Sequence, residues 1–293
     1  MAEISAASVK ELREISGAGM MECKKALVAA NGDIKLALEE MRKAGQAKAD
    51  KKSGRTAAEG VVTAEVSADN KRVVMIEINS ETDFVARDMN FMKFVSDVSG
   101  SVLKSDVGCF EEFSSVTLPG GETIELARQN LIAKIGENIN IRRARIIDTH
   151  GVIGHYVHGN RIGVIVDLEG GDAALAKDIA MHIAAVNPMV ILPSEVPQDL
   201  LDKEQEIFTA QAQSSGKPKD IIDKMTAGRL RKFLDEISLV GQPFVKNPDQ
   251  KVGDLLKEHK AQVKAFIRFE VGEGIEKVEV DFVKEVMQQA RGV

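Results

Sequence analysis

The sequence predicts an α+β protein in which a small helical unit precedes two repeated subdomains of antiparallel β-sheet and helix. Three observations support this fold class. The first 45 residues hold three short helical patterns, one strand-and-helix pattern occurs twice, and a long helical pattern interrupts the second occurrence. An amphipathic C-terminal helix is expected to close the chain.

Residues 1–45 are expected to form a three-helix domain that binds a partner, because so short a chain buries only a marginal core. Ser8–Glu11 has the form of a capping box, although the helix can begin before it. Met20–Ala30 and Ile34–Lys43 supply the second and third helices. Residues 46–59 are rich in lysine and alanine and are interpreted as a solvated linker or a frayed helix.

Met20 and Met21 follow the glycine-containing turn between the first two helices. They either fill the core of the three-helix domain or form an adaptable thioether patch for a partner.

The duplication divides the rest of the chain into two core subdomains. A shift of 90 positions places residues 159–168 over residues 69–78 without a gap. We therefore divide this part of the chain into a first repeat at 60–148 and a second repeat at 149–192 and 236–271. An inserted helical hairpin at 193–235 interrupts the second repeat, and a C-terminal module follows at 272–293.

Each copy reads strand, tight asparagine-containing turn, strand and helix, so a hairpin packed under a helix is expected twice. Ile139–Ile147 and Val263–Val271 are expected to add a third strand to each copy. In the first copy, Thr123–Ile135 is predicted to be a second helix that Gly136 ends. In the second copy, Val252–His259 is predicted to be the corresponding helix.

The inserted segment predicts two helices with facing apolar stripes, at Pro197–Ser214 and Pro218–Asp235. An antiparallel coiled-coil hairpin of this kind is too thin to bury both of its sides. Self-association into a homodimer through the hairpin is therefore left open. The closing helix is expected at Asp281–Ala290.

The two copies differ most where a strand passes into a helix. In the first copy Thr82 or Asp83 can cap the new helix, which leaves Phe84 in its first turn. Phe84 either packs against its own helix or projects as an aromatic wedge toward a partner. The second copy has Ala174 at the matching position, which favours the wedge.

Composition excludes several classes of function. A net charge of −6 gives no basic surface for direct nucleic-acid binding, and aromatic residues are too few for base stacking. Arg142, Arg143 and Arg145 cannot all face one side of a strand and are interpreted as mostly solvated. Without a long apolar run or a signal segment, no membrane association is expected, and two isolated cysteines fit a reducing, cytoplasmic location.

Catalytic and metal-binding patterns are also missing. His155 and His158 point to opposite faces of a strand, and neither an acidic nor a thiol ligand accompanies them. No nucleophile-and-base set or phosphate-binding glycine motif occurs. We therefore expect no metal, and the missing patterns agree with a protein that has no cofactor and no enzymatic activity.

Several long segments, in the same order, resemble the family of bacterial translation elongation factor Ts, the guanine-nucleotide exchange factor of elongation factor Tu. The resemblance covers nearly the whole chain. Its residues are Val9–Arg13, Gly17–Leu27, Asn31–Asp33, Thr82–Ala86, Lys134–Arg143, His158–Gly163 and Phe266–Gly274.

The resemblance implies a UBA-like fold for the N-terminal domain and a role in the elongation step of protein biosynthesis. It implies that Thr82, Asp83, Phe84 and Val85 form a tip that enters the GTPase domain of elongation factor Tu. There Phe84 would act as the wedge and Asp83 would orient the turn, so that the Mg²⁺ on the bound nucleotide is displaced. The partner-binding residues that it implies are Met20, Met21, Lys24, Ile135, Gly136 and His158.

Two other interpretations stay open at this point. The N-terminal domain could act as a ubiquitin-associated-type binding module, which a pull-down with ubiquitin against elongation factor Tu would separate. A hydrolase centred on His150–His158 is the other, and the face geometry of the histidines disfavours it.

Overall fold

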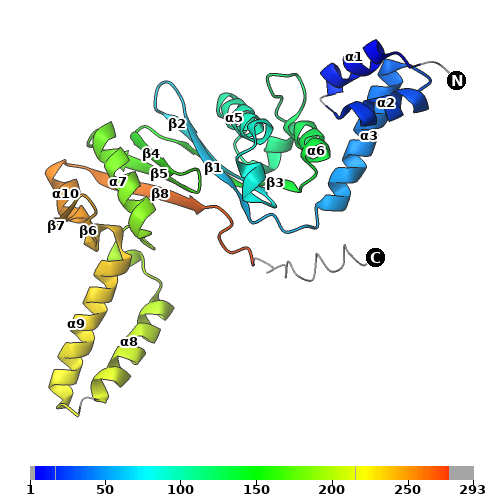
Figure 1. The fold of residues 1–293 in the computed structure, drawn as a ribbon. Coiled ribbons are helices and arrows are strands. Elements are labelled where there is room, and N and C mark those ends of the chain that lie inside the picture. Colours follow the sequence, from blue (N-terminus) through cyan, green and yellow to red (C-terminus); the bar gives the residue numbers. More distant parts are fainter. Residues whose placement is uncertain (1–3, 17, 215, 277–293) are drawn as a thin grey trace. The chain divides into compact units, whose positions relative to one another are not determined.

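The computed structural model describes residues 4–16, 18–214 and 216–276 (Figure 1). It confirms the α+β class, because N-terminal helices are followed by small sheets that helices cover. The predicted helix Asp281–Ala290 lies outside the described residues. None of the described helices combines the length and apolar character that a membrane span needs.

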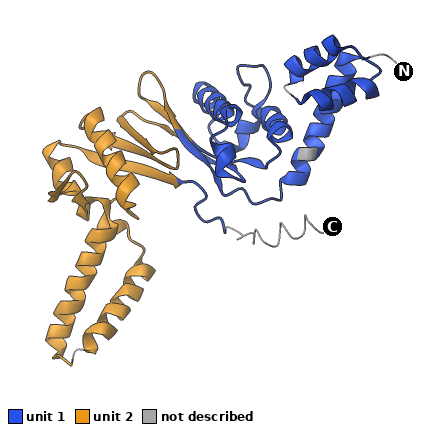
Figure 2. Cartoon of the chain, in the orientation of Figure 1, with its two compact units in different colours: residues 1–63, 76–144, 270–293 blue, residues 64–75, 145–269 orange. Residues whose placement is uncertain are grey.

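The chain forms two compact units (Figure 2). The first comprises residues 1–63, 76–144 and 270–293, and the second comprises residues 64–75 and 145–269. The N-terminal helices of the first unit are α1 (Ala6–Ser16), α2 (Met20–Ala29) and α3 (Ile34–Lys52).

Three strands form the first sheet in the order β1-β2-β3. They are β1 (Glu59–Val66), β2 (Arg72–Ser80) and β3 (Ile139–Asp148). Between the last two lie α4 (Asp83–Ala86), α5 (Met89–Lys104), the 3₁₀ helix η1 (Phe110–Ser115) and α6 (Ile124–Ile135). The predicted third strand of the first copy is therefore confirmed.

The second sheet has the order β4-β5-β8, from β4 (Val152–His158), β5 (Ile162–Glu169) and β8 (Gln262–Glu270). Helix α7 (Ala173–Val186) packs on β4 and β5. The remaining elements are η2 (Pro193–Glu195), α8 (Gln198–Gln213), α9 (Lys219–Ile237), η3 (Leu239–Gly241), β6 (Pro243–Phe244), β7 (Asn247–Lys251) and α10 (Val252–Glu258).

Two boundaries in the N-terminal region differ from the prediction. Helix α1 begins at Ala6, where Ser5 Oγ accepts the N–H of Ser8, so the capping box at Ser8 is wrong. Helix α3 continues through Gly45 to Lys52 instead of ending at Lys43, because its later turns pack against α6. Much of the predicted linker is thus helical.

The central strand of the first sheet is buried along nearly its whole length. From Val73 to Ser80 every residue of β2 is buried, and Phe91, Val95 and Val98 of α5 are buried as well. This burial fixes the strand that leads directly into α4.

A buried carboxylate on β2 accepts hydrogen bonds from two arginines on β3. Glu77 on β2 has no exposed surface, and it accepts hydrogen bonds from Arg142 at 3.0 Å and from Arg143 at 2.5 Å. The prediction of mostly solvated arginines is therefore wrong for Arg142 and Arg143, whereas Arg145 is exposed. Burial alone raises the pKa of Glu77, but the hydrogen bonds from Gly272, Asn79 and both arginines outweigh it, so the pKa lies below its ordinary value.

The second unit repeats the hairpin design. Strands β4 and β5 pair antiparallel from Val152↔Leu168 to His158↔Ile162, and both Gly159 and Asn160 in the turn have positive φ. Helix α7 supplies Leu175, Ile179 and Ile183 to the core beneath it. The short β6–β7 ribbon was not predicted, because two to five residues carry no usable periodicity.

The inserted hairpin is confirmed, with α8 packed against α9. Phe208 and Phe233 meet edge to face, with ring centroids 6.2 Å apart. Backbone bonds close its base, from Met189 N–H to the Ile237 carbonyl at 2.8 Å and from Leu239 N–H to the Val190 carbonyl at 2.9 Å.

Candidate functional site

Where the chain passes from β2 into the short helix α4, one aromatic side chain is exposed. Thr82 caps α4, since its hydroxyl oxygen accepts the N–H of Val85 at 3.4 Å. Val85 and Ala86 are buried, whereas Phe84 exposes 80% of its surface. Phe84 therefore does not pack against its own helix, and that interpretation is wrong.

The break after α4 was not expected. The sequence suggests one helix from the cap onward, but Arg87 ends α4 and Asp88 caps α5 anew, accepting the N–H groups of Asn90 and Phe91. Within α4, Asp83 forms an ion pair with Arg87 at 3.1 Å. The tip is thus a single helical turn, anchored at both ends.

Two carboxylates join the tip to the turn after α6. Glu137 accepts the hydroxyl of Thr82 at 2.8 Å and the Thr82 N–H at 3.0 Å. In the opposite direction, Glu81 accepts the N–H of Asn138 at 2.6 Å. Sequence reasoning misses both glutamates, because their backbone partners are 55 to 57 residues away in the sequence.

Ile135 and Gly136 belong to the same turn. Gly136 has φ of 89° and ends α6 as predicted, and its carbonyl accepts a hydrogen bond from Lys52 of α3. The structure thus brings these two predicted contact residues next to the segment that anchors the Thr82–Val85 tip.

The predicted contacts of the N-terminal domain lie on α2. Met20 and Met21 expose 48% and 68% of their surfaces, and Lys24 is exposed. The core of this domain comes instead from Val9, Leu12, Cys23, Leu27, Ala30 and Ala37. The core-filling interpretation of the two methionines is therefore wrong, and a thioether patch stays a prediction.

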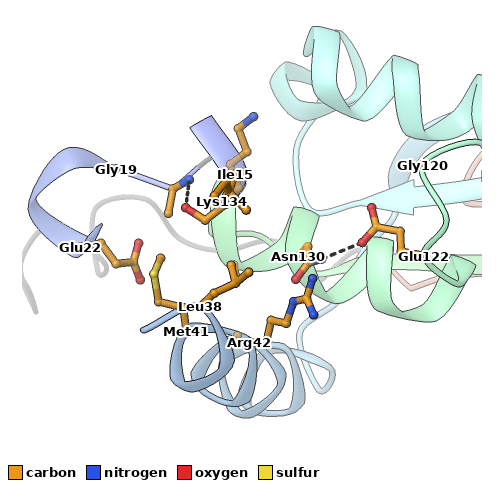
Figure 3. A pocket seen from close by; sticks show the side chains of 14 residues that line it. Ile15, Gly19, Glu22, Leu38, Met41, Arg42, Gly120, Glu122, Asn130 and Lys134 are labelled. Atoms are coloured by element: carbon orange, nitrogen blue, oxygen red, sulfur yellow. Dashed lines mark hydrogen bonds between the residues drawn. The ribbon is translucent and has the colours of Figure 1, made fainter. Parts of the chain in front are cut away.

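A cavity of about 370 Å³ lies between the N-terminal helices and α6 (Figure 3). Leu38 and Arg42 of α3 point toward α6, where Asn130 donates to Glu122 at 2.9 Å. The lining includes acidic and basic side chains, among them Glu22 and Lys134.

His158 lies in the second unit, at the end of β4. It is exposed, and its Nδ1 lies 3.0 Å from the hydroxyl of Tyr156. Across residues 4–16, 18–214 and 216–276, no three His, Cys, Asp or Glu side chains gather closely enough to hold a metal ion.

The second copy has no comparable tip. Helix α7 runs unbroken from Ala173 to Val186, and Asp172 caps it by accepting the N–H of Leu175 at 2.8 Å. Ala174, the counterpart of Phe84, presents only a methyl group at the surface. The duplicated scaffold therefore carries an aromatic tip in the first copy alone.

Comparisons with known proteins agree with the resemblance noted in the sequence. The family model described as "Elongation factor TS" matches residues 81–273. An elongation factor Ts of Legionella pneumophila is 59% identical over 291 residues, which cover 99% of this chain and 100% of the relative. The factor of Francisella tularensis subsp. novicida is 58% identical over 292 residues, with full coverage of both chains.

The factor of Methylococcus capsulatus is 56% identical over 289 residues, which cover 98% of this chain and 99% of the relative. Matches of this extent include the three-helix domain, both copies and the inserted hairpin. The chain therefore belongs to the elongation factor Ts family and has a role in translation elongation.

Proposed function

We propose that this chain is a guanine-nucleotide exchange factor that acts on elongation factor Tu in the cytoplasm. It binds the GDP-bound form and displaces the Mg²⁺ that bridges the nucleotide phosphates, so that GDP leaves and GTP can reload. The exposed Phe84, on a turn anchored at both ends, is the observation that carries this proposal.

The physical basis is electrostatic. A divalent cation is the largest local charge in a nucleotide site, so its displacement exposes phosphate repulsion and weakens GDP binding. A thousandfold faster release needs a barrier only about 4 kcal/mol lower. By linkage, the factor and the nucleotide weaken each other's binding to the partner equally.

Different surfaces of the chain have different roles in this function. The Thr82–Val85 tip acts on the nucleotide site, while Met20, Met21 and Lys24 bind the partner. Ile135, Gly136 and His158 complete the contact surface. Nucleotide exchange breaks and forms no covalent bond, so the chain needs no cofactor and no catalytic residue of its own.

Stopped-flow release of a labelled GDP from elongation factor Tu, with and without this chain, tests the proposal. We expect strong acceleration in millimolar Mg²⁺ and much less acceleration after chelation, when the ion is already gone. Equal release rates with and without the chain in Mg²⁺ would refute exchange activity. Equal acceleration in both buffers would refute the displacement of Mg²⁺.

A further inference from the structure

The anchor of the tip requires a carboxylate at position 137. Thr82 offers two donors to Glu137, its N–H and its hydroxyl, and two acceptor oxygens satisfy both at once. A glutamine would turn an NH₂ group toward one of these donors. The O–H···O⁻ bond is also charge-assisted and stronger than a neutral one.

Glu137 also sets the direction of the helix cap. Because the Thr82 hydroxyl proton points at Glu137, an oxygen lone pair remains for the N–H of Val85. Helix α4 spans only Asp83–Ala86, and so short a helix has little stability of its own. The backbone that carries Phe84 therefore depends on this cap.

The third bond of the anchor has its carboxylate on the other side of the junction. Glu81 bonds the N–H of Asn138, and the Asn138 side chain donates to the Arg55 carbonyl at 2.8 Å. Residues 81–82 and residues 137–138 thus each contribute one carboxylate and one backbone N–H, across 55 to 57 positions of sequence. Ordering this junction before the partner arrives removes part of the entropy cost of insertion.

The second copy provides an internal control. Gly136 and Lys260 both have positive φ just before a third strand, so Ala261 corresponds to Glu137, and Gly171 corresponds to Glu81. A Cβ on Gly171 would lie 3.1 Å from the Cβ of Ala261, so this junction is closed by direct contact. The two carboxylates occur only in the copy that carries the aromatic tip.

We propose that Glu137, together with Glu81, is a positioning residue for nucleotide exchange. The pair holds the Thr82–Val85 tip ready for insertion and acts through Thr82, without touching the nucleotide. This inference rests on the proposed exchange function, and it names residues that the tip itself does not include.

The test is the isosteric variant Glu137→Gln, measured by stopped-flow GDP release over a range of factor concentrations. We expect a maximum rate about tenfold lower, the effect of one lost bond to a charged group. The half-saturating concentration should change less than about twofold, because the α2 surface is intact. Amide exchange at Val85 should also become faster.

Glu195→Gln is the matched control, since one oxygen of Glu195 accepts the N–H groups of Ile191 and Leu192 at 2.9 and 3.1 Å in the second unit. It should keep the wild-type maximum rate. If Glu137→Gln does not fold, Glu81→Gln tests the same anchor from the other side.

Phe84→Ala in the same assay distinguishes the two possible failures. A wild-type maximum rate for Glu137→Gln beside a low rate for Phe84→Ala would overturn the positioning role and leave the exchange function standing. Wild-type rates for both variants would overturn the exchange function, and the positioning role with it. A change confined to half-saturation would also overturn the positioning role.

Discussion

Phe84 and Phe91 are seven residues apart and occupy opposite environments. Phe84 exposes 80% of its surface on α4, whereas Phe91 is a fully buried residue of α5. Exposed aromatic surface of this size adds nothing to the core, so its stabilising role must be small.

At the residue scale, this contrast predicts the cost of truncation. Phe91→Ala should lower the free energy of unfolding by about 3–5 kcal/mol, because it removes buried ring contacts and leaves a cavity. Phe84→Ala should change it by less than about 0.5 kcal/mol, because Thr82 still caps α4. Urea melts of the two variants measure the difference, and a large loss for Phe84→Ala would mean that the ring packs in solution.

The same scale shows what sequence could and could not reveal. Phe84 was recognisable because the two copies can be compared position by position, and the copy without a tip has Ala174. Glu137 was not recognisable, since its partner Thr82 is 55 residues away and nothing local marks the pair. For the same reason, the sequence does not reveal that Arg142 and Arg143 donate hydrogen bonds to Glu77.

At the scale of elements, the most consequential buried polar group in the second unit is His182 on α7. Its Nε2 lies 2.9 Å from Gln242 Oε1, and Val245 N–H donates to its Nδ1 at 3.2 Å. The ring is therefore neutral, with its proton on Nε2. These bonds fasten α7 to the chain around the β6–β7 ribbon.

This arrangement predicts a pH dependence of stability. Burial lowers the pKa of His182, and the bond to Gln242 offsets it only in part. Below about pH 6.5 the unfolded chain binds a proton that the folded chain does not, so stability is full above this pH and falls as the pH decreases. Denaturant melts from pH 7.5 to 5.5 measure the slope.

His182→Gln should reduce that slope, by up to about 1.4 kcal/mol per pH unit in the window. His259→Gln, at an exposed histidine, is the control for the loss of a histidine as such. An unchanged slope for His182→Gln would show that His182 does not titrate differently on folding.

The α8–α9 hairpin is a second element-scale case. Its base is closed by backbone bonds of residues 189–191 with residues 237–240, at the C-terminal end of α9 and just after it. Replacing residues 198–233 by a short Gly/Ser loop should therefore leave a cooperative thermal melt. A broad melt with strong dye binding would show that the hairpin supports the core.

At the scale of the whole molecule, binding and exchange are expected to reside on different surfaces. Met20 and Met21 are exposed on α2, outside the core of the N-terminal domain. The double variant Met20→Ala/Met21→Ala should raise the half-saturating concentration in GDP release roughly tenfold and keep the maximum rate. The control Ile207→Ala/Ile221→Ala, at exposed apolar positions of the hairpin, should change neither value.

An unchanged half-saturating concentration for the methionine variant would contradict this role of α2.

The order of the helical domain, the duplicated sheets and the insertion was predictable, because each rests on periodicity or on repetition within the sequence. The end of α3 was not predictable, because packing against α6 extends a helix that local composition leaves undecided.

Stimulated GDP release by Phe84→Ala, at a concentration that saturates elongation factor Tu, is the most direct test of the tip as a wedge. The variant should bind the partner and remain folded, while its maximum rate falls by at least about tenfold toward the unstimulated rate. A wild-type maximum rate from a folded, saturating Phe84→Ala variant would contradict the wedge.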